Sequence, residues 1–432
     1  MHEQFISIKD LAGHIGERVK LGGWVRNKRE SKKLVFIVVR DGSGEVQCVA
    51  YEPNIPPETW RAALALTLES SLIVEGEVKR HPKQEGVFEI AVTSIQPVQI
   101  AQDYPISKKE HGTEFLMDNR HLWVRSSHQV AILRIRDEII KASRDFFYDN
   151  GFYCFDSPIL TPNACEGTTT LFELDYFGDK VYLSQSGQLY QESGIMALGK
   201  TFCFGPTFRA EKSKTRRHLM EFWMLEAEAA FYDFEDNLKL QEEYVCYVVE
   251  RVLERRRLDL LTIERDISKL EAVKPPFPRI TYAESVEILK GKGFDFNFGD
   301  DFGSPEETAL AENFDRPFFI THWPEDMKAF YMKVNPADRS QVLASDLMAP
   351  EGYGEIIGGS QREDDLDTVL EKIRRHKLPE DFFQWYLDLR RYGSVPHSGF
   401  GLGIERTVCW ICGLAHIRES IPFPRMLYRK SP

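Results

Sequence analysis

The sequence of 432 residues has no uninterrupted apolar segment of the roughly 18 residues that a transmembrane helix needs, so no membrane-spanning helix is predicted. The first 20 residues contain three acidic side chains and no apolar run of the roughly 7–15 residues that is typical of a secretory signal. Glycine and proline number only 29 and 22, which argues against a collagen-like or disordered chain. With 42% hydrophobic and 28% charged residues, the composition predicts a globular protein, and the length predicts two or three domains. Because no targeting signal is recognised, we expect the protein to be cytoplasmic.

The seven cysteines are scattered, and their odd number is typical of reduced thiols rather than of a disulfide framework. Cys409 and Cys412 have the spacing of a metal-binding pair. A structural zinc site needs four ligands, however, and His416 alone follows nearby. We therefore expect Cys409 and Cys412 to be buried thiols in an apolar helix.

The chain also lacks an excess of positive charge. It contains 55 Lys and Arg against 67 Asp and Glu, a net charge of −12, which at first argues against a nucleic-acid partner. Residues 1–100 are nevertheless neutral, with 13 basic and 13 acidic side chains, so the whole excess lies in residues 101–432. Within the neutral part, residues 26–33 carry a local charge of +4 in a predicted loop. This segment is either a solvated charge run or part of an RNA-binding face.

Residues 18–99 contain five short apolar segments separated by turn signals, with a helical segment before the fourth. The sequence Asp-Gly-Ser-Gly at 41–44 predicts a hairpin between two of them. Five strands and one helix in about 80 residues are typical of a small Greek-key barrel of the OB type. The predicted strands are 19–25, 34–39, 46–50, 72–78 and 87–95, and the predicted helix is 58–67.

A second region follows a polar segment. Residues 128–150 have apolar side chains at helical spacing over more than five turns, and Asn150-Gly151 is a helix C-cap signal. Several later strands are joined by turns, so we predict an α+β fold with a mostly antiparallel sheet flanked by helices. The predicted domains are 1–102, a hinge at 103–127, and 128–432 with a helical insertion around 259–315. The predicted strands of the larger domain include 181–184, 201–204, 222–231, 318–321 and 329–334.

Residues 208–222, Phe-Arg-Ala-Glu-Lys-Ser-Lys-Thr-Arg-Arg-His-Leu-Met-Glu-Phe, join two of these strands. The loop contains six cationic or potentially cationic side chains, which repel one another unless an anion binds among them. Arg209 directly follows an aromatic strand residue, and Arg binds phosphate in bidentate geometry better than Lys does. A charged surface hairpin is the competing interpretation.

Two further segments combine glycine with charge. Residues 398–406, Ser-Gly-Phe-Gly-Leu-Gly-Ile-Glu-Arg, predict a glycine-rich strand that enters an apolar helix. Its backbone can closely approach a flat ligand, and Arg406 at the helix entrance can stack on a base or bind phosphate. Residues 346–362 place carboxylates between glycines, as in a Mg²⁺ site. A packing strand and a polar surface loop are the respective alternatives.

In their order along the chain, these segments resemble the three signature motifs of the class II aminoacyl-tRNA synthetases. The first motif is the helix and strand 128–158, the second is Phe-Arg-x-Glu with its basic loop, and the third is Gly-x-Gly-x-Glu-Arg. An OB domain before them is typical of the aspartyl, asparaginyl and lysyl subgroup, so the resemblance covers essentially the whole chain. It implies ATP-dependent formation of an aminoacyl-adenylate, transfer to a tRNA, and a homodimer formed through residues 128–158.

The resemblance implies catalytic roles for Arg209 and Arg406. Arg209 would hold the α-phosphate and the amino-acid carboxylate, while Phe222 and Arg406 would enclose the adenine. Glu355 would bind Mg²⁺ and ATP, with Asp346 as a weaker second metal ligand. The other implied ATP-binding residues are Glu211, Arg217, His218, Leu219 and Gly403.

Residues 184–192, Ser-Gln-Ser-Gly-Gln-Leu-Tyr-Gln-Glu, resemble the asparaginyl branch of the subgroup. Aspartyl enzymes usually have Ser-Pro-Gln here, a lysine in place of Gln191 and an aspartate in place of Glu226. A carboxylate accepts a hydrogen bond from an amide but repels a second carboxylate. The implied substrates are L-asparagine, ATP and tRNA(Asn), with an aspartyl enzyme that tolerates tRNA(Asn) as the alternative. The implied amino-acid-binding residues are Glu166, Ser186, Gln188, Arg209, Glu226, Glu228 and Arg362.

In the OB domain, Arg26, Phe36 and Gln47 resemble readers of the anticodon. Phe36 would stack on a base, and Gln47 would bind a base edge through its amide. A barrel-core position is the competing interpretation of Phe36. Two other functions stay open: an RNA-binding module without charging activity, which the complete set of phosphate-binding residues argues against, and an amidating paralogue, which the anticodon domain argues against.

Overall fold

The computed structural model describes residues 5–84, 86–107, 109–163, 165 and 171–432. The chain divides into two compact units, Met1–Gly112 and Thr113–Pro432, and each unit has a hydrophobic core of its own. Among the described residues, no helix is both long enough and apolar enough to cross a membrane.

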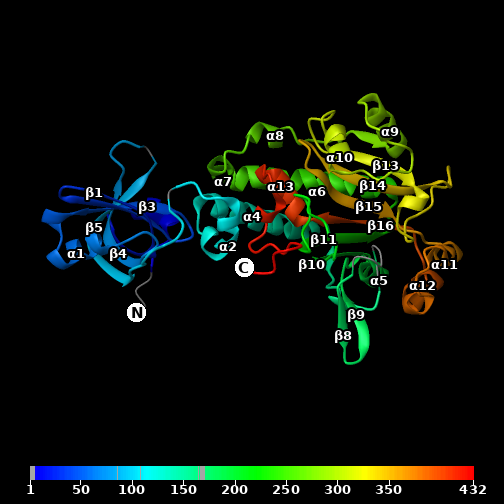
Figure 1. The fold of residues 1–432 in the computed structure, drawn as a ribbon, viewed down its shortest axis with the longest axis horizontal. Helices are drawn as coiled ribbons and strands as arrows, with labels where there is room; N and C mark the ends of the chain where they lie inside the picture. The colour runs from blue at the N-terminus through cyan, green and yellow to red at the C-terminus, as the bar shows by residue number, and fades with distance from the viewer. Residues whose placement is uncertain (1–4, 85, 108, 164, 166–170) are drawn as a thin grey trace. The chain divides into compact units, whose positions relative to one another are not determined.

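The first unit is a closed five-stranded barrel with the strand order β1-β2-β3-β5-β4, as predicted (Figure 1). The β3–β5 pair is parallel, and the other neighbours in the barrel are antiparallel. The elements are β1 (Arg18–Ser31), β2 (Leu34–Arg40), β3 (Glu45–Tyr51), α1 (Pro57–Ala65), β4 (Ser71–Arg80) and β5 (Phe88–Gln99).

The basic segment 26–33 was predicted to be a loop, and this prediction was wrong. Strand β1 continues through Ser31 and pairs with β2 on both sides of a bulge between Val25 and Asn27, so Lys32 and Lys33 alone make the turn. The bulge lets the strand bend without ending, which the sequence pattern did not reveal.

The side chains of β2 alternate between the interior and the outer surface of the barrel. Val35, Ile37 and Val39 are fully buried, whereas Phe36 is partly exposed on the outer surface. The Arg29 guanidinium lies 4.8 Å from the centroid of the Phe36 ring. The barrel-core interpretation of Phe36 is therefore wrong, because the period of two along a strand places this ring outside.

The second unit contains an eight-stranded sheet with the order β12-β13-β14-β15-β16-β11-β10-β6, and a smaller sheet β7-β9-β8. In the large sheet the β12–β13 and β10–β6 pairs are parallel and the others antiparallel, as the sequence predicted for most of the sheet. The strands are β6 (Tyr153–Cys154), β7 (Leu160–Thr161), β8 (Glu173–Tyr176), β9 (Asp179–Leu183), β10 (Lys200–Phe208), β11 (Glu221–Ala230), β12 (Arg279–Thr281), β13 (Phe318–Pro324), β14 (Gln341–Ala349), β15 (Gly354–Gln361) and β16 (His397–Gly403).

The helices of this unit begin immediately after Gly112. Their bounds are α2 (Thr113–Asp118), α3 (Arg120–Trp123), α4 (Ser127–Asp149), α5 (Gln188–Leu198), α6 (Phe234–Arg255), α7 (Arg257–Thr262), α8 (Ile267–Glu271), α9 (Tyr282–Gly291), α10 (Ser304–Ala311), α11 (Leu366–Arg375), α12 (Gln384–Arg391) and α13 (Ile404–Cys412). Cys409 and Cys412 are buried in α13, as expected.

Residues 329–334 were predicted to be a strand, and this prediction was wrong. Met332 and Val334 make isolated bridges to Arg362 and Val342. The apolar pattern has another cause, because Phe330 and Tyr331 pack into a separate core with α11 and α12.

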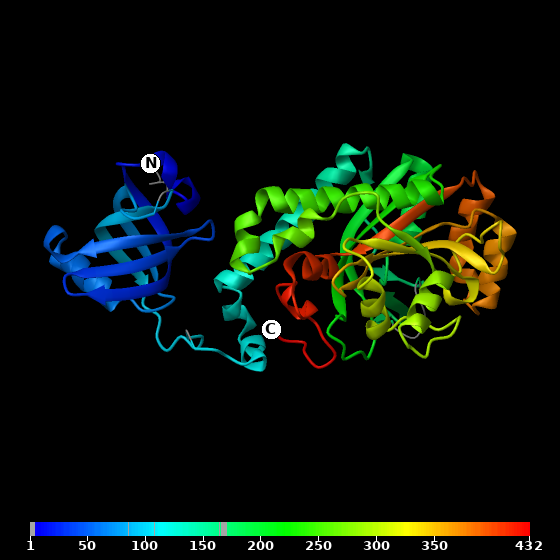
Figure 2. The ribbon, with the colours of Figure 1, turned by 90° about the horizontal axis from the view of Figure 1, so that it is seen from above.

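Helices α4, α6 and α13 pack against one face of the large sheet, and α4 and α6 lie side by side (Figure 2). Phe400 and Leu402 of β16 point into this core. Since side chains alternate along a strand, Gly399, Gly401 and Gly403 lie on the opposite face. After His397, that face is consequently free of bulky β16 side chains.

The predicted hinge 103–127 contains α2 and α3, and Arg120 of α3 is fully buried. Its guanidinium donates to the carbonyls of Pro422 and Ile421, each at 2.8 Å, and to Gln129 Oε1 at 2.7 Å. Arg120 therefore packs against the C-terminal segment, which supplies two of the acceptors that a buried guanidinium needs.

We predict that Ile37→Ala and Phe36→Ala differ in their effect on the barrel. Ile37→Ala removes a fully buried side chain and should lower the free energy of unfolding by about 2–4 kcal/mol. Phe36→Ala removes a surface ring and should cost about 1 kcal/mol or less. Urea unfolding of the whole chain measures both variants, and a larger loss for Phe36→Ala would contradict the outward orientation of this ring.

Candidate active site

Strands β10 and β11 carry a loop that returns over the glycine face of the sheet. Arg209 follows the last residue of β10, and its backbone amide donates to the Met220 carbonyl at 3.0 Å. A cavity opens beside it. All nine residues predicted to bind ATP line this cavity: Arg209, Glu211, Arg217, His218, Leu219, Phe222, Glu355, Gly403 and Arg406.

Aromatic and cationic groups face each other in this cavity. The Arg209 guanidinium lies 5.5 Å from the centroid of the Phe222 ring. Arg406, at the start of α13, donates to the Glu355 carbonyl at 2.9 Å, and its NH1 lies 3.6 Å from the Glu355 carboxylate. A planar ring and a planar guanidinium offer surfaces on which a base can stack.

His218 lies within the basic loop, 3.6 Å from the Glu211 carboxylate. Burial lowers the pKa of His218, and the positive charge of Arg406 lowers it further. The imidazole is thus favoured in its neutral form, in which one ring nitrogen donates and the other accepts.

A second cavity borders the first. Arg209, Met224, Glu355 and Gly401 line both. Of the residues predicted to bind the amino acid, Ser186, Gln188, Arg209, Glu226 and Arg362 line the second cavity, which Asp346 also lines. The two cavities thus meet at Arg209 and Glu355.

The Glu226 carboxylate, on β11, is held at the start of α5. It accepts hydrogen bonds from the Ser186 hydroxyl and from the Gly187 backbone amide, the latter at 2.7 Å. Gln188 is oriented by its own neighbours, because its Nε2 donates to Glu192 at 3.1 Å. The Ser186 hydroxyl and the Gly187 backbone amide, at the start of α5, therefore fix the position of the Glu226 carboxylate.

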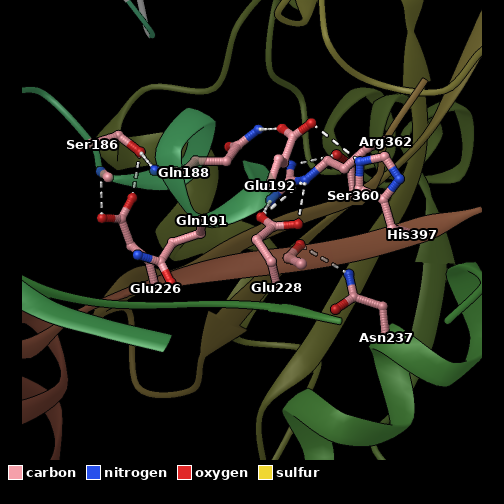
Figure 3. A network of polar contacts seen from close by, with 12 residues as sticks. Ser186, Gln188, Gln191, Glu192, Glu226, Glu228, Asn237, Ser360, Arg362 and His397 are labelled. Carbon is pink, nitrogen blue, oxygen red and sulfur yellow. Dashed lines mark hydrogen bonds and ion pairs between the residues drawn. The ribbon is translucent and has the colours of Figure 1, made fainter. Parts of the chain in front are cut away.

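Glu228 lies two residues further along β11 and forms a buried ion pair with Arg362 (Figure 3). Arg362 Nε donates to Glu228 at 3.1 Å, and Arg362 NH1 donates to the Ser360 hydroxyl at 2.7 Å. Burial raises the pKa of Glu228 to about 7 against the opposing effect of Arg362. Glu228 thus lies beneath Arg362, and Arg362 is the member of the pair that lines the cavity.

Glu192 of α5 is the centre of a fully buried network. Its carboxylate accepts from Arg390 NH2 at 2.6 Å and from the Tyr386 hydroxyl at 2.8 Å, and lies 3.1 Å from His397 Nε2. Although burial alone would raise the pKa of Glu192, the charge of Arg390 and the His397 contact hold it well below its ordinary value. This network joins α5, α12 and β16 behind the amino-acid cavity.

Gln191 was expected to act in amino-acid selection, but it does not line the second cavity. Its Nε2 donates to the Phe155 carbonyl and, at 3.0 Å, to the Ser157 hydroxyl. Gln191 is fully buried and its amide is directed at Phe155 and Ser157, so the difference in side chain expected at this position does not act through a direct contact with the cavity.

Asp346 and Glu355 lie on adjacent strands on either side of Gly358. A Cβ atom at Gly358 would be 3.0 Å from a Glu355 oxygen and 4.0 Å from an Asp346 oxygen. Burial raises the pKa of Asp346 to about 6, although Lys328 opposes this. Lys328 Nζ donates to both Asp346 oxygens, at 3.1 and 2.8 Å.

Comparison with known proteins follows the same division of the chain. Residues 112–427 match the family described as tRNA synthetases class II (D, K and N), and residues 19–98 match the OB-fold nucleic acid binding domain. The asparagine–tRNA ligase of Desulforamulus reducens is 61% identical over 98% of this chain and 99% of its own length, and that of Sorangium cellulosum is 56% identical over 99% of each.

The chain belongs to the class II tRNA synthetases, in their asparagine–tRNA ligase branch. Among solved structures, the asparaginyl-tRNA synthetase from Pyrococcus horikoshii complexed with asparaginyl-adenylate has a TM-score of 0.96 at 45% identity, and the match covers 99% of this chain and 100% of that chain. An Entamoeba histolytica asparaginyl-tRNA synthetase in complex with asparaginyl-adenylate has a TM-score of 0.89 at 35% identity, with 99% of each chain covered.

The fold brings two further residues to the amino-acid cavity that were not predicted from the synthetase sequence. Lys328 and Tyr331 line the amino-acid cavity, and the Arg362 guanidinium lies 5.3 Å from the centroid of the Tyr331 ring. Tyr331 lies in the segment 329–334, which was wrongly predicted to be a strand, and Lys328 directly precedes it. No sequence motif marked either residue. Glu166, which was expected to meet the amino group of the substrate, lies outside the described residues.

We predict that Gly399→Ala inactivates the synthetase. A Cβ at residue 399 would coincide with the Glu228 carboxylate and displace the partner of Arg362. Amino-acid-dependent ATP–pyrophosphate exchange should fall by at least about 100-fold, with a loss of about 1–3 kcal/mol in the free energy of unfolding.

Gly291→Ala is the matched control, because a Cβ at residue 291 meets no atom within 4 Å. It should retain the exchange rate and stability of the unaltered chain. Normal exchange in Gly399→Ala would show that β11 and β16 adjust to the extra carbon and that the close approach is not required.

Proposed function

We propose that the protein activates L-asparagine with ATP, releases pyrophosphate, and transfers the asparaginyl group to tRNA(Asn). The observation that carries this proposal is the meeting of the two cavities at Arg209. A carboxylate in one cavity and an α-phosphate in the other would both lie within reach of this guanidinium. The asparaginyl-adenylate in the Pyrococcus horikoshii relative joins the same two groups.

Adenylate formation needs no general base, because the asparagine carboxylate is itself the nucleophile. It attacks the α-phosphorus, the bond to the bridging oxygen breaks, and pyrophosphate leaves. The protein contributes in-line positioning and neutralisation of the charge that develops on phosphate oxygens. We assign this neutralisation to Arg209, which can bind carboxylate and phosphate oxygens through separate N–H groups.

The remaining nucleotide contacts follow from the positions of the side chains that line the first cavity. Phe222 and Arg406 provide surfaces for the two faces of the adenine, and Glu211 lies at the loop beside them. Arg217 and the neutral His218 lie further along the basic loop and would contact the outer phosphates. Leu219 and Gly403 also line this cavity, and neither adds charge.

Selection of asparagine requires partners for both ends of a carboxamide. Arg362 can donate to its oxygen and the Glu226 carboxylate can accept from its nitrogen, while the buried Glu228 carboxylate holds Arg362 from beneath the cavity. An aspartate side chain would bring a second negative charge beside these carboxylates, with an unfavourable energy that burial increases. Ser186 and Gln188 line the same cavity and can bind the polar groups of the substrate backbone.

The carboxylates of Glu355 and Asp346 fit a Mg²⁺ ion that is shared with ATP. Mg²⁺ is usually held by one or two carboxylates together with phosphate oxygens and several waters. Glu355 lines both cavities and is the main candidate, whereas Asp346 is already neutralised by Lys328. When bound, the ion would supply positive charge that offsets the negative charge of the phosphate groups.

Recognition of tRNA(Asn) is assigned to the outer surface of the barrel. Phe36, Arg26 and Gln47 lie on neighbouring strands there, with their side chains partly exposed. Arg26 lies 3.8 Å from Glu45, and Gln47 donates to Glu89 at 3.4 Å. These contacts leave the groups at the surface, where single-stranded bases can stack on them and hydrogen-bond to them.

A homodimer is also part of the proposal. Four large apolar side chains within the first motif or directly after it are exposed: Tyr148, Tyr153, Ile159 and Leu160. Strand β6 lies at the edge of the large sheet, where its outer backbone groups can pair with another chain. A self-complementary interface at this edge would bury both features.

We predict faster ATP–pyrophosphate exchange with asparagine than with aspartate. The ratio of kcat/KM should be at least about 10⁴, since a built polar site rejects a mismatched group by about that factor. Exchange assays with each amino acid measure it, and faster exchange with aspartate would refute the asparagine assignment.

Arg209→Ala is the control for the shared catalytic step. It should abolish exchange with both amino acids, because neutralisation of the transferred phosphoryl group is lost in either case. Retained exchange in this variant would refute the role of Arg209 at the junction of the cavities.

We predict that Phe36→Ala lowers kcat/KM for tRNA(Asn) charging by about tenfold, which corresponds to one lost base stack. Exchange in the absence of tRNA should be unchanged, because it does not depend on the barrel. Equal losses in charging and exchange would indicate a folding defect rather than a reading role.

We predict that Tyr153→Glu combined with Leu160→Glu converts a dimer to a monomer. Sedimentation equilibrium measures the mass of each variant. Tyr392→Glu is the matched control, since Tyr392 is also exposed but follows α12, far along the chain from the first motif and β6. A monomeric mass for the unaltered chain would contradict the dimer.

A further inference from the structure

Region 257–315, which begins with α7 and contains the predicted helical insertion 259–315, reaches the nucleotide cavity through helix α10. Glu307 and Thr308 of this helix contact Arg217 of the basic loop. Arg217 NH1 donates to the Glu307 carboxylate, and its NH2 donates to the Thr308 hydroxyl at 3.1 Å and to the Gly352 carbonyl. We call these three acceptors the Arg217 holder.

The turn between β14 and β15 is shaped around this holder. Gly352 and Gly354 both have positive φ, at +76° and +79°. A Cβ at Gly352 would lie 3.0 Å from Thr308, and one at Gly354 would overlap the Glu307 carboxylate and lie 2.9 Å from Arg217 NH1. Two positions that favour glycine for their backbone therefore also need glycine to admit the ion pair.

The same region holds this turn at a second point. Arg265, between α7 and α8, donates to Glu351 through NH1 at 2.9 Å and NH2 at 2.6 Å, and through Nε to the Ile411 carbonyl at 3.1 Å. The turn leads directly into Glu355, the main candidate for the metal. Region 257–315 therefore anchors the basic loop through Arg217 and the turn before β15 through Glu351.

The Arg217 holder restricts a side chain that is otherwise long and flexible. The side chains of Arg217 and Glu307 are 11% and 17% exposed, so their ion pair is largely screened from water. The three hydrogen bonds use three of the five N–H donors of a guanidinium. Two donors then remain for phosphate oxygens, and ordering the side chain before ATP arrives reduces the entropy that binding must overcome.

The cationic side chains around Arg217 explain why it needs the Glu307 carboxylate beside it. Arg217 lies near Arg216 and Arg406, and these like charges oppose one another before an anion binds. A carboxylate behind Arg217 offsets this repulsion without occupying the cavity, since Glu307 does not line it.

We propose that Glu307 is a positioning residue that holds the Arg217 guanidinium beside the outer phosphates of ATP. This inference rests on the proposed contact between Arg217 and those phosphates. It gives region 257–315 a function in the reaction through α10 and the turn 350–354.

The test compares Glu307→Gln, Arg217→Ala and the double variant by ATP–pyrophosphate exchange, with ATP and asparagine titrated separately. Glu307→Gln should raise the KM for ATP about tenfold and change the KM for asparagine less than twofold. The double variant should be no worse than Arg217→Ala, because the holder acts only through Arg217. Inhibition by AMP, which lacks the outer phosphates, should be unchanged in all three.

Glu312→Gln is the matched control, because Glu312 caps the C-terminal end of α10 and pairs with Lys292 at 3.0 Å, away from Arg217. It should retain the KM of the unaltered chain for both substrates. Thermal unfolding of each variant separates a loss of folding from a loss of positioning.

The outcomes test the contact of Arg217 with the phosphates separately from the positioning role of Glu307. An unchanged KM for ATP in Arg217→Ala would refute the outer-phosphate contact itself. A raised KM in Arg217→Ala with an unchanged KM in Glu307→Gln would overturn the positioning inference and leave the phosphate contact intact. Equal rises in the KM for ATP and asparagine in Glu307→Gln would also overturn it, because they would show a general structural effect.

Discussion

The close approach of β16 to the side chains of β11 is the constraint on which the site depends. Gly399 and Gly401 of β16 lie beside Glu228 and Met224 of β11, where any added Cβ would collide with them. The Glu228 carboxylate occupies the space beside Gly399, and Gly401 borders both cavities. Because Phe400 and Leu402 alternate with these glycines in the opposite core, one short strand both anchors the sheet and opens its other face.

Buried charge is tolerated beneath this face because each charge has fixed partners. Glu228 pairs with Arg362, and Glu192 pairs with Arg390 and the Tyr386 hydroxyl. Removing one member of such a pair leaves the other charge buried at a cost of about 3–5 kcal/mol. These buried ion pairs are therefore rigid, and they can present Arg362 to a substrate without rearrangement.

Local charge, rather than the net charge of −12, decides where anions can bind. Arg209, Arg217 and His218 of the basic loop line one cavity. Glu307 of region 257–315 holds Arg217 there, and Glu355 of β15 lies beside Arg406. The outer barrel surface carries its own cluster of basic residues on β1. An acidic protein can thus bind polyanions at defined places, while its overall charge reduces non-specific association.

Much of the site could be predicted from the sequence, because its motifs are local. Arg209, Glu355 and Arg406 belong to short segments whose residue types and order are informative without coordinates, and the fold brings all three to one cavity. The five barrel strands were predicted for the same reason, since alternation and turn residues are properties of neighbouring positions. Errors arose where a bulge extended β1 and where Phe330 and Tyr331 packed against helices.

The sequence by itself determined the order of elements, the glycine alternation of β16 and the residue types that can bind phosphate and carboxylate. Only the tertiary structure decided which way Phe36 and Gln191 point and which partners hold Arg217. Glu307 is 90 residues away from Arg217 along the chain. No local pattern reveals such a contact, because it forms only when α10 packs against the β14–β15 turn and the two glycines admit the ion pair.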